Sequence, residues 1–170
     1  MSESNIHVVL TQKQDYQFDI SFGANVPSIM GDEPAPLGQG MGPSPVQLLS
    51  AAVGNCLSDS LLFALRKFKQ SPEPLRCEID SEVGRNAEGR MRVLKIHAVL
   101  TLGVSAASLQ HLDRVLDQFE AYCTVTQSVG QGIPIVIEVF DNDRLRLKPQ
   151  ESLALCAFID PDQTLFQRTA

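Results

Sequence analysis

The sequence predicts an α+β protein in which a long apolar helix packs against antiparallel β-sheet. Short β-type runs come in pairs, one pair near the N-terminus and one in the middle of the chain. A long, mostly apolar segment with helix signals separates the two pairs, and shorter helical segments precede a last β-type run. Because an apolar helix must bury its surface, we expect it to lie against a sheet.

The length of 170 residues suits one compact domain. We expect a single domain over 1–140 and a C-terminal extension over 141–170, for which no structure is predicted. With 14 basic and 20 acidic residues the net charge is −6, which argues against binding nucleic acid or anionic lipid through the overall field. The chain has no Trp and two Tyr, so a platform for stacking bases is not expected.

The first predicted strand pair is Ile6–Leu10 and Tyr16–Phe22, joined by the polar sequence TQKQD as a hairpin loop. The second run alternates apolar and polar residues, which is the period of a half-buried strand. Proline and glycine dominate the following segment, 27–42, so we expect a loop with at most a brief extended piece.

The long apolar segment begins with two helix-start signals, Ser44 as N-cap and Pro45 at the first helical position. Its apolar residues cover much of the helix circumference, which is typical of a buried central helix. Val46–Leu65 is also long enough to span a membrane. However, Asp59 near a bilayer centre would cost about 3 kcal/mol, so we favour a helix in a soluble core and expect no membrane partner.

Five later elements are predicted: strands Leu75–Gly84 and Met91–Gly103, helices Ala106–Ala121 and Val125–Val129, and strand Ile133–Phe140. The first two flank the turn sequence RNAEG and should form an antiparallel hairpin. Ser105 is the expected N-cap of the first of these helices.

Four cysteines are present, but no CxxC pair and no histidine cluster accompany them. We therefore expect no metal and no cofactor. The acidic N-terminal sequence MSESNIHVVL does not resemble an export signal, so the predicted location is cytoplasmic. In a reducing cytosol a disulfide is more often transient and catalytic than structural.

Two cysteines stand at positions that favour chemistry. Cys56 lies in the middle of the long helix, behind Gly54 and Asn55. Cys123 begins a short helix, where backbone N–H groups favour a thiolate and Thr124 and Thr126 add hydroxyl groups. A single buried cysteine is most often a small core residue, and we interpret the two remaining cysteines in this way (Cys77 and Cys156).

The segment GPSPVQLLSAAVGNC, Gly42–Cys56, resembles the start of the central helix that carries the reactive cysteine in the OsmC/Ohr family of thiol-dependent peroxidases. The segment AYCTVTQSV, Ala121–Val129, resembles the family's second cysteine segment. The separation of 67 positions (123 − 56) and the order of elements also suit the family. The resemblance extends over roughly 5–140.

The resemblance implies an OsmC-like fold and an intertwined homodimer, with antiparallel sheets packed around buried central helices and pockets at the subunit interface. It also implies organic hydroperoxides as substrates, in an antioxidant response to oxidative stress. Cys56 would attack the peroxide, Cys123 would resolve the resulting sulfenic acid as a disulfide, and a dithiol reductant would restore both thiols.

One departure leaves two interpretations open. Active family members have an arginine from the N-terminal hairpin, held by a glutamate near the start of the central helix. Here Val46 stands in the glutamate's place, and no arginine precedes Arg66. Asp59, one turn after Cys56, would oppose thiolate formation if it lay close. The protein is either a peroxidase, with replacement cations among Arg85, Arg90 and Arg92, or a non-peroxidatic small-molecule-binding or auxiliary protein with an unactivated cysteine.

Overall fold

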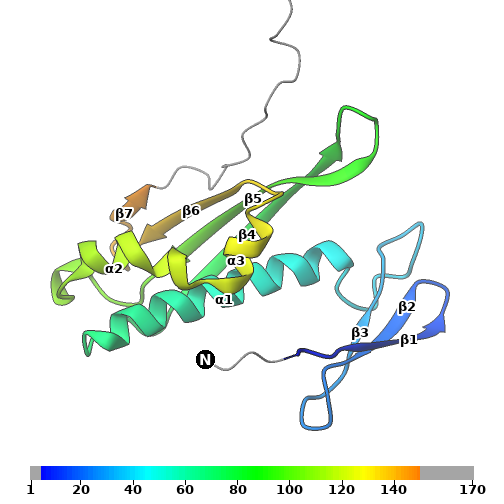
Figure 1. The fold of residues 1–170 in the computed structure, drawn as a ribbon, viewed down its shortest axis with the longest axis horizontal. Coiled ribbons are helices and arrows are strands. Elements are labelled where there is room, and N and C mark those ends of the chain that lie inside the picture. Colours follow the sequence, from blue (N-terminus) through cyan, green and yellow to red (C-terminus); the bar gives the residue numbers. More distant parts are fainter. Residues whose placement is uncertain (1–4, 150–170) are drawn as a thin grey trace, which may run out of the picture.

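The structure, a computed structural model, describes residues 5–149 and contains two β-sheets and a set of helices (Figure 1). The elements along the chain are β1 (Val9–Gln14), β2 (Gln17–Ser21), β3 (Ile29–Gly31), α1 (Pro45–Lys67), β4 (Arg76–Arg85), β5 (Met91–Thr101), η1 (Ala106–Ser108), α2 (Leu112–Gln118), η2 (Phe119–Tyr122), α3 (Thr124–Val129), β6 (Ile135–Phe140) and β7 (Arg146–Pro149). The predicted α+β class is confirmed.

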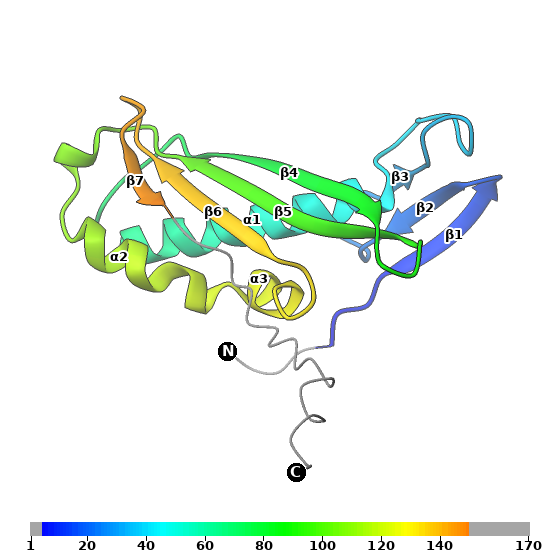
Figure 2. The ribbon, with the colours of Figure 1, turned by 90° about the horizontal axis from the view of Figure 1, so that it is seen from above.

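The three N-terminal strands form one antiparallel sheet, and β4 to β7 form the other in the order β4-β5-β6-β7. We predicted antiparallel pairs throughout, but β5 and β6 are parallel. The chain between them passes through α2 and α3, and such a crossover is what a parallel pair requires. Seen from above, the helices all lie on the same side of the four-stranded sheet (Figure 2).

The first strand differs from its prediction. It runs from Val9 to Gln14, so most of the expected loop sequence TQKQD is strand, and the turn lies at Asp15 and Tyr16. Asp15 has the left-handed φ of 45° that a tight turn requires. All six residues of β1 are exposed, so no alternation of buried and exposed positions marks this strand in the sequence. The short β3 is the brief extended piece that we expected.

The predicted start of α1 is confirmed in detail. The Ser44 hydroxyl accepts the N–H of Gln47, the Gln47 side chain accepts the N–H of Ser44, and Pro45 is the first helical residue. Among the described residues, α1 is the one helix long and apolar enough to cross a membrane by length and composition. In this structure its residues Leu57, Leu61 and Leu65 instead belong to the buried core beneath the four-stranded sheet.

The helix predicted over Ala106–Ala121 is broken into three shorter pieces. His111 adopts a left-handed φ of 58°, which separates η1 from α2. Ser105 makes no side-chain cap hydrogen bond. The Asp141 carboxylate accepts the N–H of Ala106 instead, at 3.0 Å, so the group that satisfies this helix start comes from a distant part of the chain.

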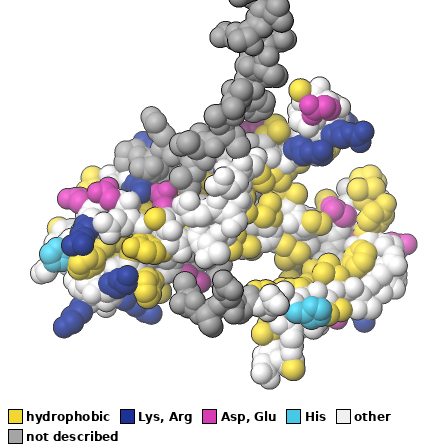
Figure 3. Space-filling model, viewed as in Figure 1, with side chains coloured by type: hydrophobic (Ala, Val, Ile, Leu, Met, Phe, Trp, Pro, Cys, Tyr) yellow, Lys and Arg dark blue, Asp and Glu magenta, His cyan; other side chains and the backbone are white. Residues whose placement is uncertain are grey.

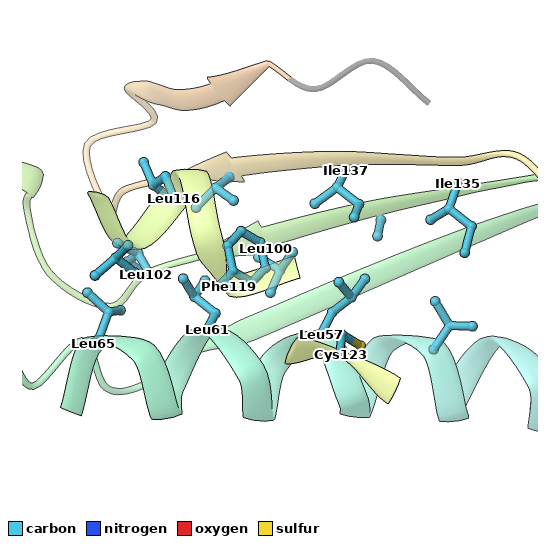
Figure 4. Packing of buried hydrophobic residues seen from close by; sticks show 14 of the residues in the cluster. Leu57, Leu61, Leu65, Leu100, Leu102, Leu116, Phe119, Cys123, Ile135 and Ile137 are labelled. Carbon is cyan, nitrogen blue, oxygen red and sulfur yellow. The ribbon is translucent and has the colours of Figure 1, made fainter. Parts of the chain in front are cut away.

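The core lies between α1, the inner face of the four-stranded sheet and η2 (Figure 4). Side chains from all three parts are fully buried there, among them Leu57, Leu61, Leu65, Ile96, Leu100, Phe119 and Ile137. The opposite side of α1, which includes Ala52, Asn55 and Phe63, is exposed in the single chain. The central helix therefore buries one face within its own chain.

The four-stranded sheet continues beyond residue 140, because β7 pairs with β6. No strand was predicted there. The predicted division between a domain over 1–140 and an extension over 141–170 stays a prediction. Residues 150–170, which include Cys156, lie outside the described residues.

Candidate functional site

Cys56 lies at the border between the buried and exposed faces of α1. It is half-buried and packs against the hydrophobic core, while its neighbour Leu57 points into that core. The sulfur is a free thiol. The helix therefore holds one cysteine where it touches both the core and the open face of the chain.

Cys123 is the N-cap residue of α3 and is fully buried. Its thiol donates a hydrogen bond to the Thr126 hydroxyl at 2.9 Å, and its backbone carbonyl accepts the N–H of Gln127. Cys123 belongs to the same buried cluster as Leu57 of α1 (Figure 4). Its sulfur lies close enough to the Cys56 thiol for Cys56 to raise the pKa of the Cys123 thiol. The two cysteines predicted from the sequence are thus brought together.

Burial raises the pKa of the Cys123 thiol, and the nearby Cys56 thiol raises it further. The Thr126 hydroxyl and backbone N–H lower this pKa, because both can donate to a thiolate, but they do not reverse the direction. We expected the helix start at Cys123 to favour the thiolate. The Thr126 N–H and hydroxyl act in the expected direction, but burial of the sulfur raises the pKa more than they lower it.

Among the residues that the structure describes, the arginines considered as replacement cations are not hydrogen bonded to the two thiols. The Arg85 guanidinium donates to the Gly89 carbonyl, and the Arg92 guanidinium donates to the Met91 carbonyl, both near the exposed β4–β5 turn. Within residues 5–149 no Lys or Arg side chain hydrogen bonds to either thiol. Asp59 is exposed and accepts a hydrogen bond from Asn55. It is therefore paired with a polar neighbour on the exposed face of α1.

Cys77 belongs to a different contact, between β4 and α1. Its sulfur lies near Gly54 and Ser58. Burial raises the pKa of the Cys77 thiol, and the nearby Ser58 hydroxyl opposes this. A Cβ on Gly54 would approach the Ile79 side chain to 2.9 Å, so glycine allows α1 and β4 to pack closely. Cys77 thus fits the packing role that we predicted.

One residue near the start of α1 was not identified from the sequence. Asp32 is buried, and its carboxylate accepts the backbone N–H groups of Glu33, Gln39 and Met41 at 2.8 to 3.1 Å and the Gln17 side chain at 3.3 Å. These bonds, the one from Met41 most of all, hold the pKa of Asp32 below its usual range. A signal was present, since an acid in a loop rich in glycine and proline often accepts local backbone N–H groups.

Asp32 also lines a cavity of about 190 Å³ between the N-terminal sheet and the start of α1. Its other walls are mostly apolar, with Tyr16, Phe18, Pro45 and Leu48 among them. Across residues 5–149, no group of three or more His, Cys, Asp or Glu side chains is arranged to hold a metal ion.

Comparisons with solved structures identify the fold. An OsmC-like protein of unknown function from Vibrio cholerae has a TM-score of 0.69 at 19% identity, with 81% of this chain and 100% of that chain covered. The OsmC-like protein from Mycoplasma pneumoniae has a TM-score of 0.67 at 13% identity, covering 82% and 99%. The organic hydroperoxide resistance protein OhrB of Bacillus subtilis has a TM-score of 0.62 at 14% identity, covering 80% and 98%.

A search of curated proteins found no significant match. The family model described as OsmC-like protein matches residues 38–138, more than half of the chain. The matched region contains Cys56 and Cys123 together with the helix and turn that bring them into contact. The chain therefore belongs to the OsmC-like protein family.

Proposed function

We propose that this protein is a thiol-dependent peroxidase that reduces organic hydroperoxides through Cys56 and Cys123. The observation that carries the proposal is the closeness of these two free thiols, one half-buried and one fully buried, the first of which raises the pKa of the second. Two neighbouring thiols suit a cycle between a dithiol and a disulfide. Their burial also limits over-oxidation of the sulfur.

The chemistry follows from this arrangement. The thiolate of Cys56 attacks the terminal oxygen of the hydroperoxide, the O–O bond breaks, and the alkoxide leaves and takes up a proton as the alcohol. Cys56 is then a sulfenic acid. The Cys123 thiol displaces its hydroxyl as water and forms the disulfide. A dithiol reductant, itself oxidised to a disulfide, returns both cysteines to thiols.

Family membership and structural relatives support the same chemistry. Two of the similar structures are organic hydroperoxide resistance proteins, from Bacillus subtilis and Elizabethkingia anophelis. Members of the family are typically dimeric. We propose that this protein is also a homodimer, whose second chain covers the exposed apolar side chains of α1 and the N-terminal sheet (Phe63, Leu10 and Phe22 among them).

A second function is favoured by the lack of a cation at the thiols in the described part of the chain. Without a positive neighbour, a cysteine at the edge of an apolar core is a weak nucleophile. The protein would then bind a small apolar ligand, and the apolar cavity beside Asp32 is a suitable place. This cavity is smaller than most ligand pockets, so the peroxidase remains our first proposal.

The test compares three variants of the reduced protein with a stoichiometric amount of cumene hydroperoxide. Cys56→Ser should abolish peroxide consumption. Cys123→Ser should consume one equivalent and leave a sulfenic acid on Cys56, which dimedone labels. Cys77→Ser is the matched control and should react as the wild type does, since Cys77 packs against Gly54 and Ser58. Wild-type consumption no faster than that of free cysteine would refute the peroxidase and leave the binding function.

A further inference from the structure

We infer that Lys148 and Glu120 are positioning residues for the thiol pair, a role that rests on the proposed function. Lys148 lies on the inner side of β7, where it pairs with Val139 of β6. Glu120 lies in η2, three residues before Cys123. The side chains form an ion pair with 2.7 Å between Nζ and Oε1, and they are only 8% and 11% exposed.

Every contact of the Lys148 ammonium group given by the structure lies in the segment leading to Cys123. Besides the Glu120 carboxylate, Nζ donates a hydrogen bond to the Leu116 carbonyl at the end of α2. It also lies 5.1 Å from the centre of the buried Phe119 ring. The Lys148 side chain, from the last described strand, thus contacts three residues of the α2–η2 segment.

The Glu120 backbone is hydrogen bonded to Cys123, so the position of Glu120 helps to fix that of the cysteine. Its carbonyl accepts the N–H of Cys123 at 3.0 Å and the side-chain N–H of Gln127 at 3.1 Å. Residue 120 is therefore fixed through its side chain by β7 and through its carbonyl by both ends of the Cys123 turn. A shift of Glu120 would carry the Cys123 sulfur along α1 and away from Cys56.

Stability alone does not account for this ion pair. Removing two charges from water costs several kcal/mol per ion, and replacing a buried pair with apolar residues of similar volume is often neutral or stabilising. A buried pair does, however, impose one geometry, because each charge must meet its partner. Reactions between held groups depend steeply on geometry, and a misplacement of about 1 Å can cost about 100-fold in rate.

The experiment measures the effective concentration of one thiol at the other in glutathione buffers. It uses the full chain with Cys77→Ser and Cys156→Ser, so that only the pair of interest reacts. Glutathione disulfide takes two electrons from the thiols and leaves as two glutathione molecules, and the equilibrium constant is this effective concentration. The variants are Lys148→Met with Glu120→Leu, Lys148→Met alone, and Arg146→Met as control. Arg146 is also on β7 but pairs with Glu138 on the exposed face.

We expect the double variant to keep the wild-type melting temperature within a few degrees, yet to lose at least about 10-fold in effective concentration. Lys148→Met alone should show the same loss together with a lower melting temperature, and Arg146→Met should match the wild type. An effective concentration within twofold of wild type in either Lys148 variant would overturn the inference, as would a wild type that forms no disulfide. No peroxide is present, so a protein that forms the disulfide but consumes no hydroperoxide would refute only the proposed function.

Discussion

The two sheets of this protein differ in how they are stabilised within one chain. The four-stranded sheet buries its inner face on α1 and η2, with side chains such as Ile96 and Ile137 removed from water. The N-terminal sheet buries little, and β1 is exposed along its whole length. Hydrophobic side chains lie on both sides of the hollow that separates it from the helices and the larger sheet (Figure 3). One region carries its own core within the chain, while the other leaves most of its apolar side chains exposed.

The largest expected effect is on the free energy of unfolding, compared between alanine variants of one leucine from each region. Leu61→Ala removes a fully buried side chain of α1 and should lower the free energy of unfolding by about 2–5 kcal/mol. Leu10→Ala changes an exposed residue of β1 and should cost less than about 0.5 kcal/mol in the isolated chain. Urea unfolding measures both, at a protein concentration low enough to favour single chains. Equal losses would show that the two regions do not differ in this way.

The next expected effect concerns association. If a second chain covers the N-terminal sheet, Leu10→Asp places an unpaired charge in that interface and should weaken the dimer about 100-fold, which corresponds to about 3 kcal/mol. Sedimentation equilibrium measures the dissociation constant. Ser108→Asp, an exposed position in η1, adds the same charge as a control. A wild type that sediments as a monomer at micromolar concentration would contradict the proposed homodimer.

The two regions also differ in how well their structure could be predicted from the sequence, because buried residues and local helix signals leave a pattern and exposed strands do not. The start of α1 was predictable because its signals are local, within Ser44, Pro45 and Gln47. The β4–β5 hairpin was predictable because one face of each strand is apolar. β1 was misplaced because none of its residues is buried. The helix after β5 was predicted as one piece because the regular spacing of its apolar residues does not reveal the left-handed φ of His111, which divides it.

The candidate site divides in a similar way. Cys56 and Cys123 could be identified from the sequence segments that carry them, and the structure brings the two together. The raised pKa of Cys123 could not be predicted, since it arises from burial against α1. Lys148 and Glu120 gave no sequence signal either, because charged side chains in strands and helices usually face solvent.

Two aspartates, one in each region, give a third prediction. Backbone N–H donors hold the pKa of both Asp32 and Asp141 below the usual range. The stabilisation from each is therefore complete above the ordinary pKa of about 3.9 and is lost as pH falls through the lowered value in the folded protein. Asp141→Asn should lower global stability at pH 7 and flatten its loss in acid, as followed by urea unfolding.

Asp32→Asn should instead act locally. Hydrogen exchange at pH 7 should show lost protection at the N–H groups of Gln39 and Met41, which the carboxylate holds in the wild type, while the amides of β5 and β6 keep theirs. Loss of protection in the strands as well would show that the N-terminal region is coupled to the core more tightly than its contacts indicate.

The smallest expected effect lies at the thiol pair. Thr126→Val removes the hydroxyl that lowers the pKa of Cys123, so this pKa should rise further above its usual range. The pH midpoint of Cys123 titration, followed by the Cβ chemical shift, should move upward, and disulfide formation should slow by a few-fold at pH 7.5. Thr124→Val alters an exposed neighbour and is the control. An unchanged midpoint would mean that the hydroxyl does not act on the thiolate.

The meeting of Cys56 and Cys123 also has a consequence for folding. A bond between sulfurs 67 positions apart would close a large ring in the unfolded chain. The lost freedom of that ring corresponds to about 4 kcal/mol in favour of the native state, by the chain-entropy estimate. Under the proposed cycle the disulfide form, produced by the oxidant, would have the higher free energy of unfolding. Reduction to the dithiol would restore a form that unfolds more easily.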